Sequence, residues 1–207
     1  MWAGGRIQTR GPLLVGHGLT RRTRIVRTEE RQGRSGLLRF VTVAHEVEQR
    51  GQIVVEEWQD VVYRSPNTGS AATRDLVTGC LPLTAGERRF PVDPTMLFRF
   101  SALTYNAHRI HYDREFAGEV EGYPGLVTHG PLQALAMTET ARAAGLMPTG
   151  QAVLEYRLRA PLFEHQGLVA RARAIGDGSV DVGVRDLSGR QTATGTLTTE
   201  DGRTSWP

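Results

Sequence analysis

The sequence predicts an α+β protein in which a curved antiparallel sheet wraps around one central helix. Two blocks rich in strand-forming residues, 5–63 and 152–199, flank a region with helix signals between residues 90 and 145. The longest expected helix carries apolar residues on one face, and such a face must be buried against another layer of secondary structure. The flanking strands are the layer that can cover it.

The first block is expected to form strands at 19–26, 37–47 and 53–62. These segments are rich in Val, Ile, Thr and aromatic residues, and turns bearing glycine and arginine separate them. Segment 64–89 changes character, because it begins with a run of small and polar residues and later contains a Cys-Leu-Pro step. We therefore expect this segment to be an interdomain linker.

Helix signals begin at Asp93 and Pro94, because an aspartate side chain can cap a helix and proline suits the first helical position. A short helix is expected over 113–120. A longer helix is expected to start at Pro131 and to end near Ala144, since a glycine follows as its stop signal.

After the longer helix the chain returns to strands over 152–199, with turns at 176–178 and 188–189. The C-terminal part therefore consists of helices followed by an antiparallel meander. This order favours a sheet that folds around the apolar helix.

Residues 10–24 resemble residues 159–173 without gaps. Seven of the fifteen aligned positions are identical, where about one is expected by chance, so we interpret the match as a duplicated unit. The identical residues are Arg10, Pro12, Leu13, Gly18, Leu19, Arg22 and Arg24 in the first copy and Arg159, Pro161, Leu162, Gly167, Leu168, Arg171 and Arg173 in the second.

The duplication implies a chain of one and a half domains. In the second copy the helix-bearing region 91–145 precedes the matched strands, and its counterpart in the first copy would fall before Met1. We expect a complete C-terminal domain over 90–207 and a truncated N-terminal domain over 1–63 that lacks its helix half. This interpretation predicts either a start codon assigned too late or a truncated protein whose exposed sheet borrows a partner.

The composition disfavours several classes of function. All 25 basic residues are arginines, interspersed with 22 acidic residues and without a basic stripe, so no nucleic-acid partner is expected. Cys80 is the only cysteine, which leaves no internal disulfide and favours a reducing, cytoplasmic location. No apolar run reaches the length of a membrane helix, about 18 residues, and the first residues lack the apolar core of a signal peptide.

Three of the six histidines, His108, His111 and His129, fall within 22 residues of one another, between the two expected helices. Reactions that pass through an enolate need a base near neutral pH and a hydrogen-bond donor at the thioester carbonyl. Histidine suits the first role, because its pKa is about 6.5. The backbone N–H groups at a helix start suit the second, and Gly130 occupies that place.

The segment from Asn106 to His111 resembles the Asp-x-Asn-Pro-(Ile/Leu)-His signature of the MaoC-like, hydratase-2 branch of the hotdog superfamily. Residues 100–113 are similar to a subgroup that includes mesaconyl-CoA and itaconyl-CoA hydratases and mitochondrial hydroxyacyl-thioester dehydratases. Residues 125–132 resemble the start of that family's central helix. The resemblance covers residues 90–200, and 1–63 resembles the strand half of the N-terminal hotdog in members with two hotdogs.

The resemblance implies a hydro-lyase that hydrates an enoyl-thioester or dehydrates a 3-hydroxyacyl-CoA. It assigns proton transfer to His111, and the family's usual aspartate is replaced by Asn106, which orients by hydrogen bonds because an amide does not titrate. The N–H of Gly130 is expected to stabilise the enolate oxygen. No cofactor is implied, the carrier is CoA or acyl carrier protein, and the chain is expected to form a homodimer or to pair with another hotdog subunit.

Three further residues are expected to contact the substrate. His108 is expected to hydrogen-bond beside His111, and His129 either satisfies backbone groups at the helix start or touches the substrate. Arg159, together with Arg157, is a candidate for binding the CoA phosphates, because guanidinium groups match phosphate oxygens. Two histidines three residues apart without a third ligand do not predict a metal site.

Some alternatives stay open. Asp113 either orients a histidine or caps the next helix, and His17, His45 and His165 are expected to be ordinary surface or loop residues. A hotdog thioesterase is a second possible function, although the spacing of the Asn–His pair favours hydration. A third is a truncated, inactive or partner-dependent subunit that only binds acyl-thioesters.

Overall fold

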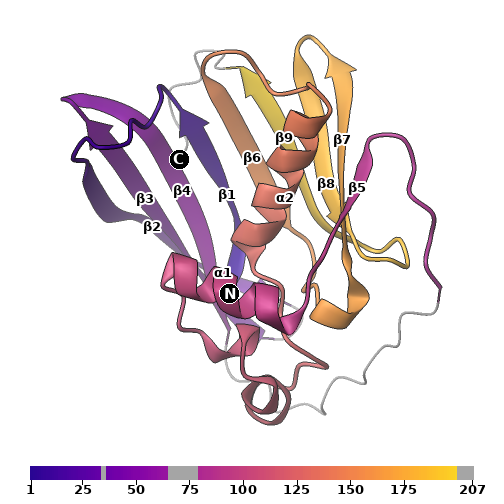
Figure 1. The fold of residues 1–207 in the computed structure, drawn as a ribbon. Coiled ribbons are helices and arrows are strands. Elements are labelled where there is room, and N and C mark those ends of the chain that lie inside the picture. Colours follow the sequence, from indigo (N-terminus) through magenta and orange to yellow (C-terminus); the bar gives the residue numbers. More distant parts are fainter. Residues whose placement is uncertain (34–35, 65–78, 200–207) are drawn as a thin grey trace.

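Nine antiparallel strands form one continuous sheet in the computed structural model, which describes residues 1–33, 36–64 and 79–199. The strand order across the sheet is β2-β3-β4-β1-β6-β9-β8-β7-β5 (Figure 1). The strands are β1 (Trp2–Thr9), β2 (Thr20–Gly33), β3 (Gly36–Gln49), β4 (Gln52–Arg64), β5 (Glu87–Phe90), β6 (Ala152–Leu158), β7 (Leu168–Gly176), β8 (Ser179–Arg185) and β9 (Gln191–Thr199).

The helix signals are confirmed. Helix α1 spans Pro94–Thr104, and the side chain of Asp93 caps it by accepting a hydrogen bond from the N–H of Met96 at 2.7 Å. Helix α2 spans Gly130–Ala143, and the glycine that follows Ala144 has φ 69°, a left-handed conformation that ends the helix. Three short helices are also present: the 3-10 helices η1 (Arg109–His111) and η3 (Glu164–Gln166), and the π-helix η2 (Phe116–Val120), which falls within the short helix expected over 113–120.

Helix α2 lies across the half of the sheet formed by β6–β9 (Figure 1). Ala136, Met137 and Ala141 on its buried face pack into one core with Val182 of β8 and Leu197 of β9. This is the central helix and curved antiparallel sheet that the sequence predicts, and the hydrophobic burial of this face stabilises the arrangement.

Strand β1 joins the two halves, because it pairs with β4 on one side and with β6 on the other. Residues 5–9 fall within the predicted strand-rich block 5–63, but β1 was not predicted as a separate strand, and glycines are unfavourable in strands. Close packing requires them: a Cβ at Gly4 would lie 2.5 Å from the carbonyl oxygen of Tyr156, and a Cβ at Gly5 would lie 2.4 Å from that of Trp58.

The strand order on either side of β1 and β6 is the same, since β1 is followed outward by β4, β3 and β2, and β6 by β9, β8 and β7. Only the second set carries a helix over its face within the described residues (Figure 1). The three predicted strands of the first set are longer than expected. Strand β5, at Glu87–Phe90, begins inside the segment 64–89 that we interpreted as a linker, and it pairs with β7. Residues 65–78 of that segment lie outside the described residues.

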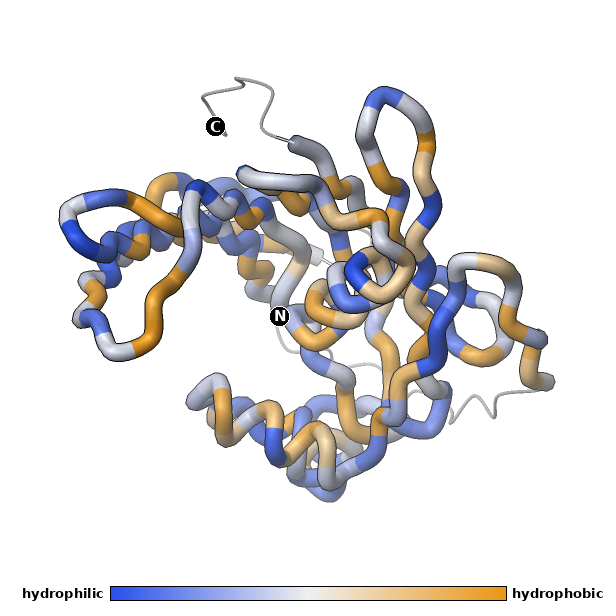
Figure 2. Tube along the Cα trace, turned by 45° about the horizontal axis from the view of Figure 1, so that its top comes forward, coloured by the Kyte–Doolittle hydropathy of each residue, from blue (hydrophilic) through white to orange (hydrophobic). Residues whose placement is uncertain are grey.

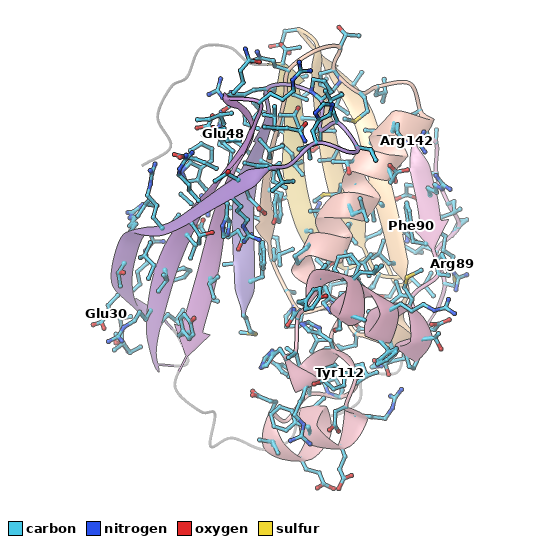
Figure 3. All side chains as sticks on the ribbon, turned by 60° about the vertical axis from the view of Figure 1, so that its left-hand side comes forward. Glu30, Glu48, Arg89, Phe90, Tyr112 and Arg142 are labelled. Carbon is cyan, nitrogen blue, oxygen red and sulfur yellow. The ribbon has the colours of Figure 1, made fainter. Side chains whose placement is uncertain are left out.

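The outer strand β2 is protected by charge. Ion pairs join Arg22 to Glu48 at 2.5 Å and Glu30 to Arg39 at 2.6 Å across the β2–β3 ladder, and Glu30 and Glu48 mark its opposite ends (Figure 3). Hydrophilic residues are frequent along these outer strands (Figure 2). Exposed pairs of this kind contribute little stability, but charged side chains discourage the edge strand from pairing with another chain.

No helix in the described segments is long and apolar enough to cross a membrane.

Replacement of Met137 by alanine tests the α2 core. Met137 is 0% exposed, so the substitution removes buried apolar contacts and leaves a cavity, and we expect the free energy of unfolding to fall by about 2–5 kcal/mol. Chemical denaturation measures this change. The control is Leu103→Ala on α1, where the side chain is 81% exposed and the expected change is below about 0.5 kcal/mol; equal losses in the two variants would contradict the assignment.

Candidate active site

A pocket of about 540 Å³ opens where the start of α2 meets the beginning of β1 and the end of β6. Its wall contains five of the six residues proposed from the sequence, although they come from positions 106 to 159. These residues are Asn106, His108, His111, Gly130 and Arg159. The sixth residue, His129, does not line the pocket and lies behind His111.

Two hydrogen bonds between η1 and the segment before α2 hold His111 in place, and we call this pair of bonds the clamp. Its Nδ1 lies 2.7 Å from the carbonyl oxygen of Val127, and the N–H of Val127 donates to the carbonyl of Ile110 at 2.9 Å. A carbonyl oxygen only accepts hydrogen bonds, so Nδ1 carries the proton and Nε2 carries the free lone pair. The clamp therefore fixes both the position of the ring and the tautomer of a base.

Burial keeps this base uncharged. Desolvation lowers the pKa of His111 to about 4, although the hydrogen bond to Val127 acts in the opposite direction. At neutral pH the ring is therefore ready to accept a proton at Nε2.

His129 supports His111 from behind. The two imidazole rings are stacked, with centroids 3.7 Å apart and planes inclined by 16°, and Phe100 packs on His129 at a centroid distance of 4.8 Å. Nε2 of His129 lies 2.9 Å from the hydroxyl of Ser101 on α1. Burial lowers the pKa of His129 to about 3, so its ring also stays neutral. The Ser101–His129 pair positions the ring of His111 without facing the pocket.

Asn106 lies directly after α1, which ends at Tyr105 in a left-handed conformation. Its side-chain oxygen accepts a hydrogen bond from the N–H of His108 at 3.0 Å. Because the side-chain oxygen is bonded to this backbone N–H, the NH₂ group of Asn106 remains available to the pocket, where it can donate hydrogen bonds. The ring of His108 is exposed and stands edge-on to that of His111, with 6.0 Å between centroids.

Gly130 is the first residue of α2, and its N–H has no hydrogen-bond partner in the described part of the chain. Such an N–H at a helix start carries partial positive charge and suits an oxyanion. A Cβ here would lie 2.5 Å from Leu158 Cδ1 and 3.2 Å from Trp2 Cβ, so packing against the pocket wall requires the glycine.

Sequence reasoning missed Thr128. Its side-chain oxygen is buried, lines the pocket and has no hydrogen-bond partner among the described residues. A single threonine in a loop has no pattern that marks it as a pocket residue. Trp2 was also missed, because it belongs to β1, which was not predicted as a separate strand.

The remaining candidates lie at the edge of the site or outside it. Arg159 is exposed at the rim, where its Nε donates to Thr194 at 3.2 Å, and Arg157 lines a separate pocket. Asp113 is a cap, because it accepts a hydrogen bond from the N–H of Phe116 at 2.9 Å. The expectation of a surface position was wrong for His45, which is 5% exposed on β3. The described residues contain no group of three or more His, Cys, Asp or Glu arranged for a metal ion.

The hydroxyacyl-thioester dehydratase type 2 family matches residues 1–164, and the chain belongs to this family. The chain is 43% identical to the mesaconyl-C(4)-CoA hydratase of Chloroflexus aurantiacus over 178 residues, which cover 86% of this chain and 62% of that relative. It therefore spans less than two thirds of the relative's length. The resemblance drawn from the 106–111 motif is confirmed at the level of the family.

Solved structures confirm the hotdog fold. HtdX of Mycobacterium tuberculosis superimposes with a TM-score of 0.69 at 20% identity, over 97% of this chain and 75% of that one. A second protein of the same organism, described as a double hotdog fold, gives a TM-score of 0.60 at 15% identity, over 96% of this chain and 74% of that one.

The two buried histidines predict that acid destabilises the fold. Their pKa values in the folded chain are about 4 and about 3, below the ordinary value of about 6.5 in the unfolded chain. Between these limits the unfolded chain binds more protons, so stability is complete above pH of about 6.5 and declines as the pH falls toward about 4. Urea denaturation across this range measures the decline.

The matched variants for this measurement are His129→Phe and His17→Gln. His129→Phe removes one of the two groups and should weaken the dependence on pH. His17→Gln, at an exposed position, is the control for a histidine substitution elsewhere in the chain. An unaltered slope in His129→Phe would show that His129 does not contribute.

Proposed function

We propose that this chain is a hydro-lyase that adds water to the double bond of an enoyl-CoA and, in reverse, dehydrates a 3-hydroxyacyl-CoA. The observation that carries the proposal is that His111, a neutral histidine with Nδ1 bonded to Val127, lines the same pocket as Gly130, whose helix-start N–H is unpaired among the described residues. Family membership and the hydratase relative support it. Acyl carrier protein is the alternative carrier, and the reaction needs no cofactor.

In hydration, Nε2 of His111 takes a proton from water while the water oxygen attacks C3 of the enoyl-thioester. The NH₂ group of Asn106 donates a hydrogen bond that orients the water, and the Thr128 hydroxyl is a second polar group available to it. The proton on Nε2 then moves to C2 on the same face, which completes the addition of H and OH. General acid–base catalysis of this kind supplies about 10²–10⁴-fold.

The charge that develops during the reaction has two partners. The enolate oxygen accepts a hydrogen bond from the N–H of Gly130, where the α2 dipole favours negative charge. The transient imidazolium of His111 faces the neutral ring of His129, and an aromatic face attracts a cation. Arg159 at the rim suits the CoA phosphates, because its guanidinium is exposed there.

We also propose two hotdog units, 1–63 and 90–207, because the strand order repeats on either side of β1 and β6. The face of β2–β4 carries no helix within the described residues (Figure 1). This feature favours a homodimer or pairing with another hotdog subunit.

Replacement of His111 by glutamine tests the catalytic assignment. Glutamine retains hydrogen bonding but does not take up the proton, so turnover should fall by about 10²–10⁴-fold or more with little change in Tm. The assay follows loss of enoyl absorbance with crotonyl-CoA and mesaconyl-CoA, and His17→Gln is the control. Full activity in His111→Gln would refute the role of His111 as the catalytic base. If the wild type released free thiol without loss of enoyl absorbance, the result would favour a thioesterase activity instead.

The low pKa of His111 predicts the acid limb of the pH profile. The base form of the free enzyme persists until the pH approaches about 4, so kcat/KM for hydration should stay level from pH of about 8 to about 5 and fall below that. Initial rates across this range measure it. A limb near pH 6.5 would indicate a solvated histidine and contradict the buried base.

A further inference from the structure

A second cavity, of about 400 Å³, lies beyond the catalytic pocket along the same helix. On α2 the catalytic pocket is lined by Gly130, Pro131 and Gln133, and the second cavity by Pro131, Ala134, Leu135 and Thr138. The helix therefore forms a common wall, and Pro131 belongs to both spaces.

The two strands beneath the helix repeat this order. On β1 the catalytic pocket contains Trp2 and the second cavity contains Ile7. On β6, which runs in the opposite direction, the catalytic pocket contains Leu158 and the second cavity contains Leu154. The lining residues of α2, β1 and β6 therefore all place the second cavity next to the catalytic pocket in the same direction. The two cavities lie end to end in one groove.

One side-chain pair lies at the junction of the cavities. Trp2 lines the catalytic pocket, Tyr156 lines the second cavity, and the indole Nε1 of Trp2 donates a hydrogen bond to the Tyr156 hydroxyl at 2.8 Å. Tyr156 is 4% exposed, and burial raises the pKa of its phenol, so the hydroxyl stays neutral. Trp2 also lies close to the start of α2, since a Cβ on Gly130 would be 3.2 Å from Trp2 Cβ.

The second cavity suits a hydrocarbon chain. Most of its lining is apolar, and its polar side chains are Thr9, Glu57, Thr138 and Tyr156. The Glu57 carboxylate disfavours a second carboxylate there, because like charges repel at close range. A neutral alkyl chain is the ligand that this lining fits.

We propose that the hydrogen-bonded pair Trp2–Tyr156 is the specificity-determining wall of the catalytic pocket, which restricts the substrate to short acyl chains. This inference rests on the proposed hydration of enoyl-thioesters. In this arrangement the thioester carbonyl lies at Gly130 and the CoA moiety extends toward solvent beside Arg159. A longer acyl chain then reaches the second cavity only by displacing the indole of Trp2.

The test compares full-length wild type, Trp2→Ala and Tyr156→Phe with enoyl-CoA esters of four and eight acyl carbons. Wild type should prefer the four-carbon ester. Each methylene that enters an apolar cavity improves binding roughly fourfold, so Trp2→Ala should raise the ratio of kcat/KM for eight against four carbons at least about tenfold. Tyr156→Phe removes only the hydrogen bond and should give a smaller change in the same direction.

Trp58→Ala is the matched control. The guanidinium of Arg6 lies 5.3 Å from the Trp58 ring centroid, and Trp58 lines neither cavity, so its removal should leave the chain-length ratio unchanged. Trp2→Leu replaces Trp2→Ala if the alanine variant fails to fold, because leucine retains apolar packing but is shorter than the indole. Circular dichroism and Tm verify folding.

Calorimetric binding of saturated butyryl-CoA and octanoyl-CoA separates this inference from the proposed function. If the wild type hydrates no enoyl-CoA but Trp2→Ala gains affinity for octanoyl-CoA, the proposed hydration activity is refuted and the proposed role of Trp2–Tyr156 in limiting chain length is supported. If wild type accepts both lengths equally, or if Trp2→Ala changes neither the kinetic ratio nor the binding ratio, the wall is overturned. An ω-carboxylated eight-carbon ester should gain less than the neutral ester, because of Glu57.

Discussion

The hydrogen bond between Nδ1 of His111 and the carbonyl of Val127 connects a side chain of η1 to the segment that leads into α2. Because the carbonyl only accepts, the bond specifies the tautomer and leaves Nε2 as the free base. It also sets the distance between that base and the first turn of the helix. The proposed chemistry depends on this contact, since a base and an oxyanion donor act together only when both are held in place.

The surroundings of this bond explain why a buried imidazole is maintained despite its cost. His129 stacks on the ring and is itself bonded to Ser101, so two neutral histidines share one apolar site. Burial lowers the pKa of both, which makes the site sensitive to acid but keeps the base unprotonated at neutral pH. Burial of the two histidines therefore lowers stability at low pH, and it keeps the base in the protonation state that the reaction requires.

Much of the fold follows from local sequence patterns. The Asp93 cap, the helix starting at Pro131 and the presence of strands in both halves were predicted because capping and side-chain periodicity are local properties. Strand β1 was missed because Gly4 and Gly5 lack strand propensity, and its glycines are needed only where β4 and β6 pack close to it. The burial of His45 depends on Arg21 and Thr23 of the neighbouring strand, which no local pattern reveals.

The sequence by itself predicted the class of fold and the position of the central helix, because these depend on periodicity. It also singled out five residues that line one pocket, three of them within the 106–111 motif. Only the tertiary structure decided that His129 supports His111 from behind, that the Asn106 oxygen is occupied by the N–H of His108, and that Trp2 meets Tyr156. The His111–His129 and Trp2–Tyr156 contacts join separate segments of the chain, and the latter residues are 154 positions apart. Their geometry arises from packing, which chain-local propensities do not encode.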